Sequence, residues 1–137
     1  MQSLSSSLTS QEQEFAIVQN GLSKHGFALG GNWDYDHGSF DCALDDKSTV
    51  WLRLPFHVTN GNLDSESPET DAKIRFGEPY VLKHLYNEGI DKEGGMGMLG
   101  ALINQFSDPV DPDADIESRW IEAAKSKLRQ VEAIYPA

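Results

Sequence analysis

A chain of 137 residues with a formal net charge of −11 is long enough to bury its own core, and its length favours a single domain. The acidic excess argues against binding to nucleic acid or to an anionic membrane surface. The single cysteine excludes an internal disulfide, and no apolar stretch resembles a secretory signal or a membrane span. We therefore expect a cytoplasmic protein.

The first part of the chain predicts a disordered tail followed by a helix. Residues 1–10 are serine-rich, so we assign the folded domain to residues 11–137. Thr9 or Ser10 can cap a helix at this point, and Gly26 is typical of a helix end. The apolar residues that recur at helical spacing between them are Phe15, Val18 and Leu22.

The segment 33–42 predicts a tight β-hairpin. His37 and Gly38 form a natural two-residue loop, because glycine adopts the positive φ that such a turn requires. In the resulting register Asp34 lies directly opposite Asp41. The apolar residues that then share the other face are Trp33, Tyr35, Phe40 and Cys42.

A further strand over residues 49–58 would place a cation beside these carboxylates. A loop of residues 46–48 pairs Asp41 with Arg53, so we predict a polar row of Asp34, Asp41 and Arg53 across an antiparallel sheet. Three interpretations remain open: a solvated ion pair, a small-ligand or anion site at the arginine, and a metal held by the two aspartates. Two carboxylates beside an arginine bind cations poorly, so no metal ligand is assigned.

The later strands carry two ambiguities. Pro55 cannot donate a hydrogen bond in a sheet, so it lies either on the unpaired side of an edge or at a bulge. Strict alternation places His57 on the face of Arg53, and a bulge would reverse this. Residues 72–76 predict a fourth strand whose basic residues can join that face. Residues 80–86 fit a strand or a short helix.

Three blocks of this region resemble the YugN-like family of small Bacillus-type proteins, over roughly residues 26–91. The blocks are Gly31-Asn32-Trp33-Asp34-Tyr35-Asp36 followed by Phe40-Asp41, then Trp51-Leu52-Arg53, and finally residues 83–90 with the sequence Lys-His-Leu-Tyr-Asn-Glu-Gly-Ile. The resemblance implies an intracellular α+β domain and no established activity.

The C-terminal third predicts one long amphipathic helix. It also contains two ligand-binding motifs, and the residues around each motif argue against binding. The glycine string of residues 95–100 matches a dinucleotide-binding motif, but no buried strand precedes it. Residues 111–122 match a calcium loop except at Ile116, where glycine is required. Residues 98–106 are a candidate partner surface. The helical stripe consists of Ile116, Trp120, Ala124, Leu128, Val131 and Tyr135.

The elements together predict an α+β fold: an antiparallel β-meander of four or more strands, with an N-terminal and a C-terminal helix packed on one face. The candidate ligand-binding residues are Asp34, Asp41, Arg53, His57 and His84, with no catalytic residue, metal or cofactor assigned. We expect a non-catalytic cytosolic domain that acts through an unknown protein partner or as a homodimer. The alternative is a small-ligand-binding protein or weak enzyme with a polar site around Arg53, His57 and His84.

Overall fold

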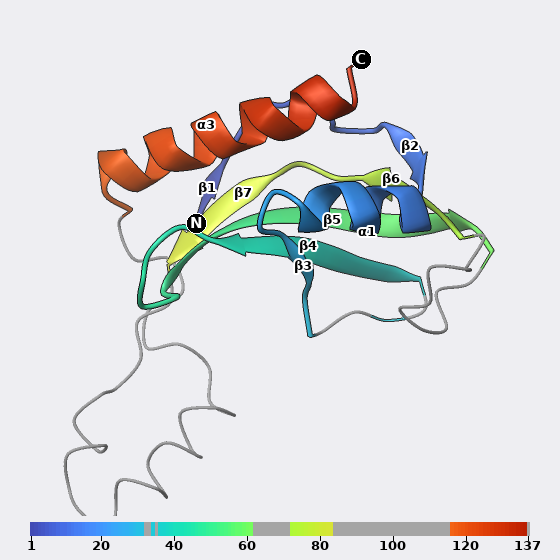
Figure 1. The fold of residues 1–137 in the computed structure, drawn as a ribbon, viewed down its shortest axis with the longest axis horizontal. Helices are drawn as coiled ribbons and strands as arrows, with labels where there is room; N and C mark the ends of the chain where they lie inside the picture. The colour runs from blue at the N-terminus through green and yellow to red at the C-terminus, as the bar shows by residue number, and fades with distance from the viewer. Residues whose placement is uncertain (32–33, 35, 62–71, 84–115, 137) are drawn as a thin grey trace, which may run out of the picture.

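The computed structural model describes residues 1–31, 34, 36–61, 72–83 and 116–136 of the chain (Figure 1). These ranges contain one antiparallel sheet and two helices. In chain order the elements are β1 (Gln2–Ser3), β2 (Glu12–Glu14), α1 (Phe15–Ser23), β3 (Ala28–Leu29), β4 (His37–Ala43), β5 (Val50–Asn60), β6 (Lys73–Phe76), β7 (Tyr80–Lys83) and α3 (Ser118–Ile134).

The sheet is built around β5. β4 pairs with one side of β5, and β3 continues the sheet beyond β4. On the other side, β7 pairs with the first half of β5 and β6 with the second half, so these two short strands lie end to end. β1 then pairs with β7 and β2 with β6. Every pairing is antiparallel, as predicted.

Both helices pack on the same face of this sheet (Figure 1). Residues in β5 alternate between buried and more exposed positions as far as His57, so one face of the strand enters the core. The helix stripes predicted from the sequence supply the other side of this core. The buried helix residues are Phe15, Val18 and Leu22 from α1, and Ala124, Leu128 and Val131 from α3. The α+β fold with its helices on one face is therefore confirmed.

The register of the β4–β5 hairpin is also as predicted. Asp41 lies opposite Arg53, and the two apolar pairs on either side of it match the expectation. Residues 80–83 form β7, so the part of the ambiguous segment that the structure describes is a strand. Neither helix in the described ranges has the length and apolar character that crossing a bilayer requires.

Pro55 occupies a position that neither sequence interpretation anticipated. The register of β5 shifts between Val58 and Asn60, so there is no bulge at the proline. Its carbonyl accepts a hydrogen bond of 2.8 Å from the N–H of Gly77. Because the N and O atoms of a strand residue point to the same side, the missing N–H faces the junction between β6 and β7. An internal strand tolerates proline here because the neighbouring strand is interrupted.

The hairpin predicted at His37 and Gly38 is wrong. Both residues lie inside β4, paired with β5, and the neighbour of β4 on its other side is β3. Asp41 is therefore opposite Ala28 rather than Asp34. Both registers send the same residues of β4 into the core, so sequence alternation could not distinguish between them.

Residues 1–10 form an ordered segment where the sequence predicted a disordered tail. β1 extends the sheet, and Leu4 and Leu8 are buried in the core. Glu12–Glu14 form β2, so the helix begins at Phe15 and not directly after the predicted cap at Thr9 or Ser10. Gly26, with a φ of +86°, ends the helical region as expected. Two leucines within a polar stretch give too weak a pattern to reveal this packing.

Several predicted features lie outside the described residues. They are the faces of Trp33 and Tyr35, the position of His84, the glycine string of residues 95–100, the candidate partner surface of residues 98–106, and the acidic stretch of residues 111–115.

Candidate functional site

The candidate site lies on the face of the sheet that is turned away from α1 and α3, which we call the outer face. Strand alternation and cross-strand pairing determine which side chains belong to it. The outer face includes His37, Ser39 and Asp41 from β4, Trp51, Arg53, Pro55 and His57 from β5, Arg75 from β6 and Tyr80 from β7.

An ion pair between Asp41 and Arg53 occupies the centre of the outer face. The arginine donates from Nε to Oδ1 at 3.0 Å and from Nη2 to Oδ2 at 3.2 Å. Ser39 also donates to Oδ1, at 2.9 Å. Only 12% of the aspartate side chain and 24% of the arginine side chain are exposed. The pair is therefore more enclosed than the solvated row considered from the sequence.

The electrostatics of the pair keep the arginine charged. Burial alone would lower the pKa of Arg53, but its interactions with Asp41 and Tyr80 outweigh burial and raise the pKa. The guanidinium carbon also lies 6.0 Å from the centre of the Tyr80 ring, within the range of a cation–π contact. The arginine is thus held from two sides, by a carboxylate and by an aromatic ring.

A hollow of about 240 Å³ opens beside this pair. Typical ligand pockets are larger, at roughly 300–1,000 Å³. His57 lies on the same face, opposite His37, but it is exposed and does not line the hollow. The lining residues are His37, Gly38, Ser39, Arg53, Pro55, Phe56 and Tyr80.

The structure brings together only part of the predicted site. Asp41 and Arg53 meet as expected, whereas Asp34 lies in the connection between β3 and β4, where its N–H donates to the carbonyl of His37. The sequence interpretation missed Tyr80, because the pairing of β7 with β5 has no local signal. Ser39 shares the face of Asp41 through strand alternation, and their hydrogen bond could not be predicted from spacing.

A second polar group lies at the start of β4. One ligand atom from each of Asp34, Asp36 and His37 lies within 4.8 Å of the others, and His37 Nδ1 is 2.6 Å from a carboxylate oxygen of Asp36. Carboxylate and imidazole groups are common metal ligands. All three side chains are exposed, and exposed acidic groups often gather without an ion. We assign no function to this group.

Over the residues that the structure describes, the fold and the site define a small α+β protein with one antiparallel sheet, two helices on one face and a largely buried ion pair on the other. A model of the YugN-like family matches residues 3–135, and the chain belongs to this family. The resemblance found in three sequence blocks is therefore confirmed over nearly the whole chain.

Individual relatives agree with this assignment. The chain is 33% identical over 110 residues to the uncharacterized protein YugN of Bacillus subtilis (strain 168), covering 80% of this chain and 79% of that protein. The fold is similar to the crystal structure of the uncharacterized conserved protein YugN from Geobacillus kaustophilus HTA426. That similarity has a TM-score of 0.67 at 19% identity and covers 97% of this chain and 93% of the other. These relatives indicate the family and the fold, and no activity.

Proposed function

We propose that this chain is a non-catalytic domain that acts by associating with another protein chain through its outer face. The observation that supports this most directly is the arrangement of Trp51, Arg53 and Tyr80. The first two project from alternate positions of β5, and Tyr80 lies opposite Arg53 on β7. Tryptophan, tyrosine and arginine contribute most often to the binding energy of protein interfaces.

The outer face is a better candidate for this association than a sheet edge. Among the described strands, the outermost ones are short: β1 and β3 have two residues each and β2 has three. Short edge strands offer few free backbone groups to a partner and are a common protection against edge pairing. The side chains of the outer face therefore provide the stronger basis for recognition.

The chemistry of the ion pair supports binding more than catalysis. A guanidinium remains protonated at physiological pH, and Asp41 strengthens this tendency at Arg53. The aspartate is occupied by Arg53 and Ser39, so its oxygens are already hydrogen-bonded. Such a pair can orient a partner, but it is poorly suited to proton transfer.

Site-specific photo-crosslinking tests the proposal. A photo-reactive phenylalanine analogue at Trp51 should crosslink to another protein chain in cells, and mass spectrometry of the product identifies that chain as a second copy or a different protein. The same analogue at Arg119, an exposed position on α3 with 70% of its side chain accessible, is the control. Equal crosslinking from both positions, or none from Trp51, would contradict the proposal.

A small polar ligand bound beside Arg53 is the second candidate function, and the 240 Å³ hollow is the observation that favours it. Because Asp41 balances the charge of Arg53, an uncharged or zwitterionic ligand fits this position better than a simple anion. Native mass spectrometry of the purified protein tests this candidate. A reproducible adduct that is lost in Arg53→Ala and kept in Arg119→Ala would support it, and a bare protein mass would contradict it.

A further inference from the structure

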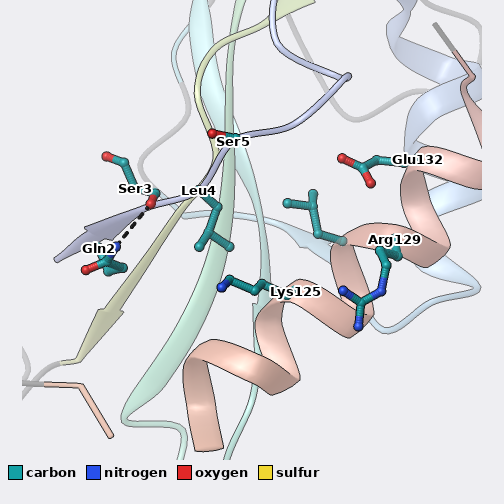
Figure 2. Close-up of a pocket in the computed structure, with 8 residues that line it drawn as sticks. Gln2, Ser3, Leu4, Ser5, Lys125, Arg129 and Glu132 are labelled. Atoms are coloured by element: carbon teal, nitrogen blue, oxygen red, sulfur yellow. Dashed lines mark hydrogen bonds between the residues drawn. The ribbon is translucent and has the colours of Figure 1, made fainter. Parts of the chain in front are cut away.

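A larger pocket lies on the opposite side of the sheet from the outer face, between β1 and α3 (Figure 2). Its volume is about 440 Å³, within the range of roughly 300–1,000 Å³ that is typical of small-molecule sites. One wall comes from the N-terminal strand and the residues after it, and the other from one face of α3. The lining residues are Gln2, Ser3, Leu4, Ser5, Lys125, Leu128, Arg129 and Glu132.

Positive charge predominates in this pocket although the chain as a whole is strongly acidic. Lys125 and Arg129 are four residues apart on α3, so both side chains lie on the same helix face (Figure 2). Within the described part of the chain, Arg129 has neither an ion pair nor a side-chain hydrogen bond. Lys125 contacts Glu122 at 3.7 Å in an exposed pair, which restrains it only weakly.

The carboxylate in the pocket is already engaged by the N-terminal segment. Glu132 Oε2 accepts hydrogen bonds from Ser6 Oγ at 2.8 Å and from the N–H of Ser7 at 3.3 Å. Within the described residues Glu132 makes no ion pair with Lys125 or Arg129, so it does not occupy either cation. Leu4 and Leu128, which are 5% and 3% exposed, provide an apolar floor between the polar walls.

We propose that this pocket binds a small organic anion, a carboxylate or a phosphate monoester, that carries a compact apolar group. The anionic end would accept charge-assisted hydrogen bonds from Arg129 and Lys125, and the apolar group would face the leucine floor. The two sites lie on opposite sides of the sheet, so this inference does not depend on the proposed function of the outer face.

Calorimetric titration with simple probes tests the inference. Phenyl phosphate and phenylacetate should each bind with 1:1 stoichiometry, and the tighter of the two indicates whether the site suits a phosphate or a carboxylate. Benzyl alcohol, which has the ring without the charge, should bind at least tenfold more weakly. Arg129→Gln and Lys125→Gln should each weaken the anionic probes about tenfold, the usual effect of losing one charge-assisted hydrogen bond.

A matched variant distinguishes binding at this pocket from nonspecific attraction of the anionic probes to positive charge on α3. Arg119→Gln removes the same charge from the same helix, but its guanidinium stacks on Trp120 and is not part of the pocket. It should leave probe binding unchanged. The inference fails if Arg119→Gln weakens binding as much as Arg129→Gln, if neither anion binds saturably, or if Arg129→Gln binds normally. Thermal melting of each variant confirms that it is folded.

Discussion

The Asp41–Arg53 pair shows how burial changes the value of an ion pair. An exposed pair contributes about 0–1 kcal/mol, because water screens the charges and two long side chains lose freedom. Here both side chains are mostly buried, and Ser39 provides the carboxylate with a third hydrogen bond. Removing one partner would leave the other charged, partly buried and without its counter-ion, which is far more costly than losing the pair as a unit.

A double-mutant cycle measures this coupling. Asp41→Ala and Arg53→Ala should each lower the free energy of unfolding by about 2–3 kcal/mol. The loss in the double variant should be smaller than the sum of the two single losses by at least about 1 kcal/mol. Urea unfolding provides all four values. The exposed pair of Glu122 and Lys125 is the control, with an expected coupling below about 0.5 kcal/mol. Additive losses at the first pair would show that the two charges are effectively solvated.

Individual elements were predictable where a loop and an alternating pattern specified the same register. The β4–β5 hairpin is the example, because its loop length and the apolar positions on both strands agree. β2 was not predictable, because its three residues carry no periodicity. The partner of β4 was misassigned because Gly38 resembles a turn residue, while tertiary pairing keeps it inside a strand.

The β4–β5 loop contains a carboxylate that holds the turn in shape. Asp45 Oδ1 accepts hydrogen bonds from the N–H groups of Thr49 at 2.8 Å and Val50 at 3.0 Å, and the Thr49 hydroxyl donates to Oδ2. Burial acts to raise the pKa of Asp45, but these hydrogen bonds act more strongly and lower it. The charged form is therefore favoured by folding.

This shift makes the contribution of the loop depend on pH. When folding lowers the pKa of a carboxyl group, the group stabilises the folded state at pH values above its unfolded pKa. This stabilisation is lost as the pH falls through the folded pKa. Asp45→Asn should lower the free energy of unfolding by about 0.5–1 kcal/mol at pH 7, and the difference should shrink below about pH 4. Urea unfolding across this pH range measures it. Asp46→Asn, at the neighbouring exposed position, should change the free energy of unfolding by less than about 0.5 kcal/mol at pH 7. A pH-independent loss at Asp45 would contradict the assignment.

At the scale of the whole molecule, the two ends of the chain pack together. Ser6 Oγ donates to Glu132, 126 positions away, and Gln11 Nε2 donates to the carbonyl of Tyr135 at 2.9 Å. A Cβ atom at Gly21 would lie 2.5 Å from the Tyr135 hydroxyl, so the glycine leaves room for this side chain against α1. These contacts join segments that are distant in sequence, so no local pattern could have predicted them.

The same reasoning explains why the candidate sites were only partly predictable. One hairpin register was enough to place Asp41 opposite Arg53. The pocket between β1 and α3 needed the N-terminal segment to be ordered, and the sequence predicted the opposite. A site formed within one hairpin can thus be inferred from the sequence alone. A site formed between the two ends of the chain requires the tertiary structure.

The ordered N-terminal segment can be tested through Leu8, whose side chain is fully buried in the core. If residues 1–10 pack as the structure describes, Leu8→Ala should lower the free energy of unfolding by about 2–5 kcal/mol, because it leaves a cavity beneath the segment. Ile17→Ala removes a similar apolar group from a position that is 55% exposed, and should cost less than about 1 kcal/mol. Urea unfolding compares the two variants directly. A disordered tail would make Leu8→Ala neutral, and it would also remove one wall of the pocket that we propose for a small organic anion.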